Sequence, residues 1–375
     1  MAALILNKPV IAVTGSSGKS TTKEMISSIL ETRWRVFKSV ENHNLYWETQ
    51  KYAKQIKPEH DAVVLEYGMI YHGRIKRHCQ AIRPNIGIIT MIGTAHAGNL
   101  GGVAGVVKAK SEMIQYMDPN GTLLLNADDR HSQKLPFKRF GGRLIWIGID
   151  QPADYRAKDI RFTRRGMRFV AEYRSQAEWF EIPVLGLHNI YNALYAIAVA
   201  DRLGFRPSEI RAGFRRFKQL DRRLTVHRLG HGITLLDDTF SANPNAVMAA
   251  IDVLKQLGGG RKVAVLGSML ELGELSERGH KRVGRWAAKR GVDQLVTYGK
   301  AARWIDEGAV QAGLSPDCIK HFESKTALKA YVRGLVKPNT TILFKASHDM
   351  RLDMTVRFVL KGGKNRAKPQ EDDDA

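Results

Sequence analysis

The sequence predicts an α/β protein of two domains, each with a mostly parallel sheet covered by helices. Three observations lead to that fold class. Short apolar runs alternate with amphipathic helical patterns along most of the 375 residues. A charged segment, Lys218–Leu224, divides this alternation into two series. The chain is also long enough for two or three domains, since each commonly needs about 100–200 residues.

The first series predicts residues 1–218 as one domain. Its buried strands are expected at four short apolar runs, Val10–Val13, Ala62–Leu65, Ile86–Thr90 and Thr122–Asn126. After the first strand, a helix is indicated by apolar residues that share one face, Met25, Ile26, Ile29 and Leu30. Residues 153–184 predict a small antiparallel insert with strands at Tyr155–Phe162, Met167–Tyr173 and Trp179–Val184. The pattern that follows predicts a helix over Ile190–Leu203.

The second series predicts residues 219–360 as another domain. Its strands are expected at Ile233–Leu236, Val263–Leu266, Leu295–Tyr298 and Thr341–Phe344. A helix is predicted to begin at Pro244 and to end at the glycines 258–260. Residues 361–375 change from basic to acidic and are predicted to form a disordered tail.

Composition excludes a mostly disordered or fibrous chain, because 43% of the residues are apolar and 26% are charged. The 59 Lys and Arg residues outnumber the 37 Asp and Glu residues, which gives a net charge of +22. That charge favours anionic partners, but it does not choose among nucleotides, polyphosphates, nucleic acid and membrane surfaces. Two cysteines, no leader pattern and no apolar run of about 18 residues predict a cytoplasmic protein without a membrane span.

The segment Val10–Thr22 predicts a phosphate-binding loop between the first strand and the first helix. Its glycines allow backbone N–H groups to approach phosphate oxygens, and the helix N-terminus favours negative charge. Lys19 is expected to neutralise the β- and γ-phosphates, while Ser20 binds Mg²⁺. With ATP as the nucleotide, the expected binding residues are Gly15, Ser16, Ser17, Gly18, Lys19, Ser20 and Thr21.

Polar residues follow two further strands, at the edge of the sheet where ligands of α/β proteins gather. Glu66 comes after the strand Ala62–Leu65, and His96 follows the strand Ile86–Thr90. Together these side chains could hold a second Mg²⁺. Taken singly, each has a plain structural interpretation: a carboxylate at a strand end is usually solvated, and the lysines in Lys108–Glu112 fit an exposed helix face.

In their order along the chain, these segments resemble the motifs of the Mur ligase family, from about Val10 to Arg357. The matching segments are Thr14–Glu24, Pro84–Gly87, Thr94–His96, Lys108–Glu112, Gly186–Asn192, Ala242–Pro244 and Val265–Gly273. The ordered set is far more specific than any single motif. The resemblance implies a P-loop-containing central ligase domain followed by a Rossmann-like C-terminal domain. It also implies ATP-dependent joining of an amino acid or peptide to a carboxylate.

The resemblance implies roles for the matching residues of this sequence. Those expected to be catalytic are Lys19, Lys110 and His96. The expected ligands, for two Mg²⁺ ions and with Lys110 as a carbamate, are Ser20, Glu66, His96 and Lys110. Beyond the phosphate-binding loop, nucleotide contacts are implied for Asn189, Asn192, Arg223 and Asp238. Substrate contacts are implied for Asn42, Asn44, Asn243, Lys345 and Ser347.

Departures from the family pattern fall mainly on the substrate side. The chain is expected to lack the N-terminal domain with which family ligases bind a UDP-sugar. Phe240 and Ser241 stand in place of a Tyr-Asn pair, and Ser268 replaces an aspartate. Ala346 and His348 replace a glycine and an arginine. These differences affect the choice of substrate more than the chemistry, because the metal and ATP positions are kept.

The main hypothesis is an ATP-dependent, ADP-forming amide ligase that works through an acyl phosphate and whose carboxylate substrate is not assigned. An alternative is the family reaction that joins D-alanyl-D-alanine to a UDP-muramoyl tripeptide in peptidoglycan synthesis. A P-loop NTPase or phosphotransferase acting on a polyanion is a different class, and it predicts interleaved basic and aromatic residues that the sequence does not show. A catalytically inactive nucleotide-binding protein is disfavoured by the joint presence of Lys19, Glu66, His96 and Lys110. We expect a monomer without sequence-specific nucleic-acid binding, and a partner chain could supply substrate contacts.

Overall fold

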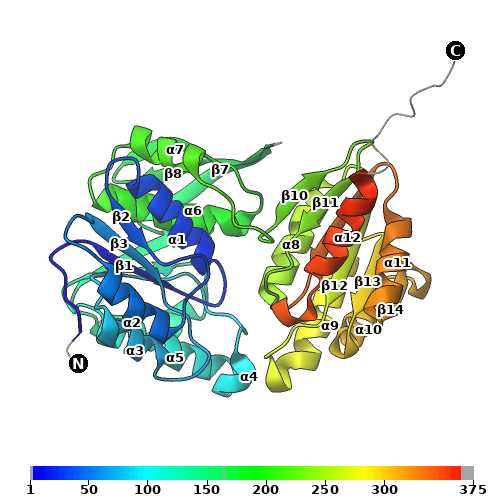
Figure 1. The fold of residues 1–375 in the computed structure, drawn as a ribbon, viewed down its shortest axis with the longest axis horizontal. Coiled ribbons are helices and arrows are strands. Elements are labelled where there is room, and N and C mark those ends of the chain that lie inside the picture. Colours follow the sequence, from blue (N-terminus) through cyan, green and yellow to red (C-terminus); the bar gives the residue numbers. More distant parts are fainter. Residues whose placement is uncertain (1–2, 164, 365–375) are drawn as a thin grey trace, which may run out of the picture. The chain divides into compact units, whose positions relative to one another are not determined.

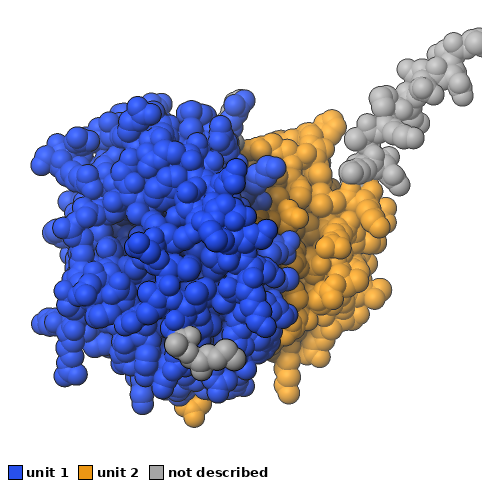
Figure 2. Space-filling model, turned by 60° about the vertical axis from the view of Figure 1, so that its left-hand side comes forward, with its two compact units in different colours: residues 1–219 blue, residues 220–375 orange. Residues whose placement is uncertain are grey.

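The computed structural model describes residues 3–163 and 165–364. The chain divides into two compact units, Met1–Gln219 and Leu220–Ala375, which Figure 2 shows in different colours. This division lies within the charged segment that interrupts the sequence pattern. The last helix, α12 (Asp353–Lys364), continues past residue 360. The rest of the predicted disordered tail, residues 365–375, lies outside the described residues.

The described part of unit 1 forms a single sheet from nine strands: β1 (Val10–Thr14), β2 (Val36–Lys38), β3 (Ala62–Glu66), β4 (Ile86–Ile89), β5 (Thr122–Asn126), β6 (Arg143–Gly148), β7 (Tyr155–Thr163), β8 (Gly166–Tyr173) and β9 (Gln176–Ile182). Their order across the sheet is β2-β3-β1-β4-β5-β6-β7-β8-β9. Neighbours from β2 to β7 run parallel, whereas β7, β8 and β9 are antiparallel. The predicted mostly parallel sheet is confirmed, and its antiparallel insert is the edge of the same sheet.

Helices cover both faces of this sheet (Figure 1). On one face lie α1 (Lys19–Leu30), α6 (Leu187–Arg202) and α7 (Pro207–Arg216), and on the other lie α2 (Tyr46–Gln55), α3 (Arg74–Ala81) and α5 (Val103–Tyr116). A short helix, α4 (Ala97–Leu100), precedes α5. Every residue of β1 is buried, which explains why this strand reads as a continuous apolar run rather than an alternating one. None of the helices in the described part of the chain is long and apolar enough to cross a membrane.

The described part of unit 2 has a six-stranded sheet: β10 (Thr225–Arg228), β11 (Thr234–Asp237), β12 (Arg261–Gly267), β13 (Gln294–Tyr298), β14 (Ile319–Phe322) and β15 (Thr340–Lys345). The order is β10-β11-β15-β12-β13-β14, and only the edge strand β10 is antiparallel to its neighbour. The remaining helices are α8 (Pro244–Leu257), α9 (Ser276–Lys289), α10 (Arg303–Gln311) and α11 (Lys325–Leu335). Such a helix-covered parallel sheet agrees with the Rossmann-like expectation.

Candidate nucleotide-binding and catalytic site

The loop between β1 and α1 has a backbone path that only its glycines permit. Gly18 has a φ of +83°, and a Cβ there would lie 2.5 Å from Oδ1 of Asn192. A Cβ on Gly15 would lie 1.8 Å from Oγ1 of Thr90. Neither position can take a side chain without displacing its neighbour. Helix α1 begins at Lys19, directly after the loop, so the positive end of its dipole favours an anion there.

Thr90, just beyond β4, holds this loop in place. Its hydroxyl donates a hydrogen bond to the Ser17 carbonyl oxygen at 2.6 Å. The backbone N–H of Ser16 donates to the Met91 carbonyl oxygen at 2.9 Å. Thr90 has no predicted role; the signal available for it is a hydroxyl residue that ends an apolar strand next to the phosphate-binding strand.

Asn189 and Asn192, expected at the nucleotide, are buried at the start of α6. The Thr22 hydroxyl on α1 donates to Oδ1 of Asn192 at 3.0 Å, and Nδ2 of Asn192 donates to Oδ1 of Asn189 at 2.8 Å. Nδ2 of Asn189 in turn donates to the Leu185 carbonyl oxygen at 2.7 Å. The two amides therefore link α6 to the phosphate-binding helix. Their contact with adenine stays a prediction.

Glu66 ends β3 and pairs in register with Val13 of the phosphate-binding strand. The residue is 2% exposed. Nδ2 of Asn44 donates to Oε1 of Glu66 at 2.7 Å, whereas Oε2 is buried and has no hydrogen-bond partner among the described residues. A buried carboxylate oxygen left in this way is costly unless a cation or a proton donor completes it. The group therefore fits a ligand of Mg²⁺, which prefers carboxylate oxygens.

Lys110 lies on α5 and is 1% exposed. Burial, followed by the positive charge of Lys19, holds the pKa of Lys110 well below its usual range. This environment favours the neutral amine. The electrostatic effect of Lys19 also shows that the fold brings these two predicted catalytic residues near each other.

The other predicted residues of unit 1 differ in exposure. Ser20 is buried on α1, Lys19 and Thr21 are half-buried, and Asn42 is exposed in the loop after β2. His96 stands directly before α4 with a left-handed φ of +61°. Within residues 3–163 and 165–364, no group of three or more His, Cys, Asp or Glu residues could hold a metal. The metal-ligand set of Ser20, Glu66, His96 and a carbamate on Lys110 therefore stays a prediction.

In unit 2, Lys345 and Asp238 bind each other. Lys345, at the end of β15, is 2% exposed, and its Nζ donates to Oδ2 of Asp238 at 2.6 Å and to the Ser241 carbonyl oxygen at 2.8 Å. Burial lowers the pKa of Lys345 despite this carboxylate partner. The ammonium group thus fixes the segment after β11, and contact of either residue with ATP or substrate stays a prediction.

Three more predicted residues also have contacts inside unit 2. Oδ1 of Asn243 accepts a hydrogen bond from the N–H of Ala246 at 3.0 Å and so caps α8. Oγ of Ser347 accepts from the N–H of Leu270 at 2.9 Å. The Arg223 guanidinium lies over the ring of Phe240, 4.0 Å from its centroid. These contacts position the loops at the carboxyl ends of the parallel strands.

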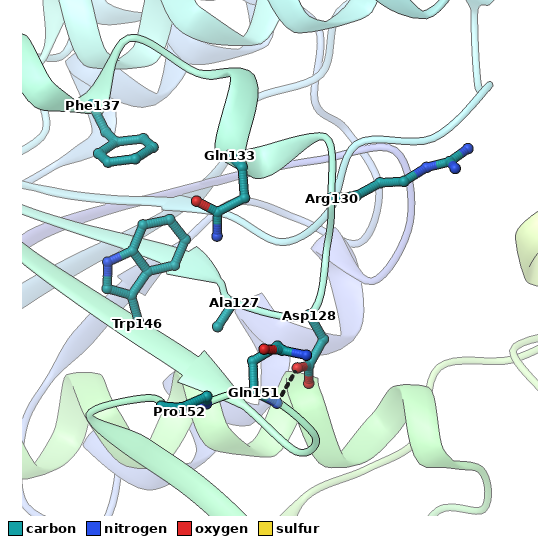
Figure 3. A pocket seen from close by; sticks show the side chains of 8 residues that line it. All are labelled: Ala127, Asp128, Arg130, Gln133, Phe137, Trp146, Gln151 and Pro152. Atoms are coloured by element: carbon teal, nitrogen blue, oxygen red, sulfur yellow. Dashed lines mark hydrogen bonds between the residues drawn. The ribbon is translucent and has the colours of Figure 1, made fainter.

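A separate pocket of about 660 Å³ lies at the ends of β5 and β6 in unit 1 (Figure 3). Its lining residues are Ala127, Asp128, Arg130, Gln133, Phe137, Trp146, Gln151 and Pro152. Phe137 and Trp146 meet edge to face with centroids 5.2 Å apart, and Arg130 extends away from them. The Asp128 carboxylate accepts from the N–H groups of Ile149 at 2.6 Å and Gln151 at 2.7 Å. No predicted site residue lines this pocket.

Comparisons with known proteins place both units in one family. Residues 13–200 match the Mur ligase middle domain, and residues 222–348 match the Mur ligase, glutamate ligase domain. UDP-N-acetylmuramoyl-tripeptide–D-alanyl-D-alanine ligase of Bacillus subtilis is 32% identical over 95% of this chain and 77% of its own length. The enzyme of that name from Escherichia coli is 32% identical over 94% of this chain and 77% of its own length.

Solved structures give the same result. A crystal structure of MurF from Acinetobacter baumannii superposes with a TM-score of 0.87 at 28% identity, covering 94% of this chain and 76% of that one. MurF ligase from Thermotoga maritima in complex with ADP superposes with a TM-score of 0.82 at 24% identity, covering 96% and 81%. The sequence-based expectations of a ligase of the Mur family and of its fold are confirmed. Because these matches span both units, the chain belongs to the Mur ligase family.

Proposed function

We propose that the protein is an ATP-dependent, ADP-forming ligase that joins a carboxylate to an amino acid or dipeptide. The observation that supports this most is the buried Glu66 carboxylate, on the strand next to the phosphate-binding loop, with one oxygen unpartnered among the described residues. A phosphate-binding loop by itself fits many nucleotide-binding proteins. A buried carboxylate beside that loop fits the nucleotide-binding proteins that use Mg²⁺ to transfer the γ-phosphoryl group.

The proposed reaction has two steps. A carboxylate oxygen of the substrate attacks the γ-phosphorus of ATP, the bond to the β–γ bridging oxygen breaks, and ADP leaves. The amine nitrogen of the second substrate then attacks the acyl carbon, the bond to the phosphate oxygen breaks, and the nitrogen loses a proton as the amide forms. Lys19 and the N-terminal N–H groups of α1 stabilise the charge on the phosphate oxygens. Two Mg²⁺ ions, one held by Ser20 and the other by Glu66 and His96, would neutralise further phosphate charge.

Lys110 is proposed to act as a carbamate. A neutral amine keeps the lone pair that attacks CO₂; one proton is released, and the product is an anion. That anion would also interact favourably with the positive charge of Lys19. It would also supply oxygen ligands of the kind that Mg²⁺ prefers.

Two pairs of substrates are proposed. The relatives named above are ligases for a UDP-N-acetylmuramoyl tripeptide and D-alanyl-D-alanine, and this pair comes first. The second is an acidic peptide polymer with an amino acid, because a net charge of +22 attracts such a carboxylate. The replacements at Phe240, Ser268 and His348 keep the second pair open. We also propose a cytoplasmic monomer, with a partner chain as the alternative source of substrate contacts.

A screen of ADP release tests the proposal. Candidate carboxylates are crossed with amino acids and dipeptides in the presence of ATP and Mg²⁺, and the Lys19→Ala variant serves as the inactive control. We expect ADP release to require one carboxylate and one amine together, with formation of their amide detected by mass spectrometry. ADP release that needs neither substrate, or that single-stranded nucleic acid stimulates strongly, would instead support an NTPase.

A further inference from the structure

Lys23, one turn into α1, is a fully buried lysine that has no role in the phosphate-binding loop or in the proposed reaction. Its side chain is 0% exposed. Nζ donates to the carbonyl oxygens of Ser39 and Glu41, each at 2.7 Å, and forms an ion pair with Oε1 of Glu24 at 2.7 Å. All three donor positions of the ammonium group are therefore used. Two of them bind the backbone of one loop, the segment after β2.

That loop, residues 39–44, is the one that contacts Glu66. The Ser39 hydroxyl accepts a hydrogen bond from the backbone N–H of Glu66 at 3.1 Å, and Nδ2 of Asn44 donates to the carboxylate at 2.7 Å. The Asn44 carbonyl oxygen accepts from the N–H of Gly68 at 2.9 Å. Both ends of the loop are thus fixed on the carboxylate residue and the segment that follows it.

Few hydrogen bonds support the middle of the loop among the described residues; one of them runs from the N–H of His43 to the Val40 carbonyl oxygen, at 2.9 Å. Val40, Glu41 and Asn42 are exposed, and Glu41 has a left-handed φ of +40°. The Tyr52 hydroxyl also supports the loop, because it accepts from the N–H of Val40 at 3.2 Å and donates to the His43 carbonyl oxygen at 3.3 Å. A loop with a strained residue and few buried apolar contacts keeps one conformation only when its hydrogen bonds impose it.

We propose that Lys23 is a positioning residue that fixes the 39–44 loop, through which Asn44 orients the Glu66 carboxylate for a divalent cation. The arrangement links Glu66 to α1, the helix that follows the phosphate-binding loop, because Lys23 and Lys19 lie on this helix one turn apart. Asn44 occupies one carboxylate oxygen and leaves the other for the cation. This inference rests on the proposed function for the identity of the cation, whereas the coupling of Lys23 to the loop does not.

The test compares Lys23→Met with Lys38→Met. Both variants remove an ammonium group bound to Glu24, since Nζ of Lys38 lies 3.0 Å from Oε2 of Glu24. Among the described residues, however, Nζ of Lys38 contacts no residue of the 39–44 loop. In Lys23→Met, we expect faster amide hydrogen exchange in residues 39–44, and an increase of about 10- to 100-fold in the Mg²⁺ concentration that gives half-maximal ADP release. Lys38→Met should leave both quantities at their original values. Unchanged exchange and Mg²⁺ dependence in Lys23→Met would overturn the proposal.

Tyr52→Phe provides a second test that does not depend on a buried charge. It removes one hydroxyl from the other support of the loop, so it should also raise the half-maximal Mg²⁺ concentration, by a smaller factor, with an unchanged KM for ATP. Hydrogen exchange is measured on the protein without substrates. If Lys23→Met shows faster exchange but the original protein shows no Mg²⁺-dependent ADP release, the proposed function is refuted and the link between Lys23 and the 39–44 loop is kept. If residues 39–44 exchange at the original rate in both Lys23→Met and Tyr52→Phe, that link alone is refuted.

Discussion

At the scale of single residues, burial decides which predicted groups are chemically unusual. Lys110 and Lys345 are both fully buried lysines, but Lys345 has the Asp238 carboxylate at 2.6 Å, whereas burial and the positive charge of Lys19 both lower the pKa of Lys110. A lysine with a carboxylate partner remains an ammonium group that holds a loop. A lysine beside a like charge is available for modification.

This contrast predicts the behaviour of Lys110→Ala. The variant should lose most phosphate release, because the proposed carbamate oxygens are gone, and short carboxylic acids such as acetate should restore part of it by entering the space. Rates with and without added acid measure the effect, and chloride at equal ionic strength is the control. Full activity of Lys110→Ala without additives would remove Lys110 from the site.

Gly18 gives a prediction with a matched control. In Gly18→Ala, the new Cβ would meet Asn192 at 2.5 Å and the residue would keep a φ of +83°. Gly73→Ala imposes the same kind of strain, at a φ of +80°, but its Cβ meets no atom within 4 Å. Both variants should lose about 1 kcal/mol of stability from the backbone. Only Gly18→Ala should weaken nucleotide binding, by about tenfold or more, in a fluorescent-nucleotide titration; equal affinities would show that the clash is relieved without cost.

His78 predicts how stability changes with pH. Its Nδ1 lies 2.7 Å from the Thr49 hydroxyl and its Nε2 lies 3.0 Å from the Gly68 carbonyl oxygen, and burial lowers its pKa to about 4. The unfolded chain, with a histidine pKa near 6.5, therefore binds more protons than the folded protein between pH 4 and 6.5. The free energy of unfolding should fall by about 3 kcal/mol as the pH decreases across that window. Urea titrations should show a much smaller fall in the free energy of unfolding for His78→Gln over the same pH range. An equal pH dependence in the variant and the original protein would contradict the lowered pKa of His78.

At the scale of elements, the sequence predicts most of the buried parallel strands, but it misses the inner strand β6 and the short edge strands β2, β10 and β14. The strands β1, β3, β5 and β12 each contain a continuous apolar run because both faces are covered, and that pattern is visible in the sequence. Strands β2, β10 and β14 are three or four residues long and only partly buried. A short edge strand takes its conformation from the neighbour to which it bonds, so it carries no pattern of its own.

The site follows the same rule. The phosphate-binding loop can be predicted because β1, the glycines and α1 are consecutive in the sequence. The contacts of Asn44 with Glu66 and of Thr90 with Ser17 join segments that lie 22 and 73 residues apart, so they depend on the order of strands in the sheet. That Asn192 binds Thr22, 170 residues away, is likewise a property of the fold, since local spacing does not contain it.

Asn243 predicts a division between stability and activity at one element. Its side chain caps α8, so Asn243→Ala should destabilise unit 2 by about 1 kcal/mol, whereas Asn243→Ser keeps a capping oxygen and should lose only a few tenths. Thermal unfolding measures these values. If the predicted substrate contact is also real, Asn243→Ser should raise the KM of one substrate while remaining stable; an unchanged KM would leave only the capping role.

At the scale of the whole molecule, the net charge of +22 predicts how ionic strength affects the enzyme. A carboxylate substrate with several negative charges should show a KM that rises severalfold between about 0.05 and 0.2 M KCl, because salt screens the attraction. The KM of a zwitterionic amine substrate should stay nearly constant and is the internal control. Equal salt dependence of both would mean that the charge does not act on substrate capture.

The contact between Gly15 and Thr90 has a consequence for how such sequences diverge. A Cβ on residue 15 would fall 1.8 Å from Oγ1 of residue 90, so the two positions share one small volume and cannot change independently. Descendants that acquire alanine at position 15 should be found only with glycine or alanine at position 90, and they would then lack the hydroxyl that binds the Ser17 carbonyl. Related sequences with threonine at position 90 should therefore have glycine at position 15.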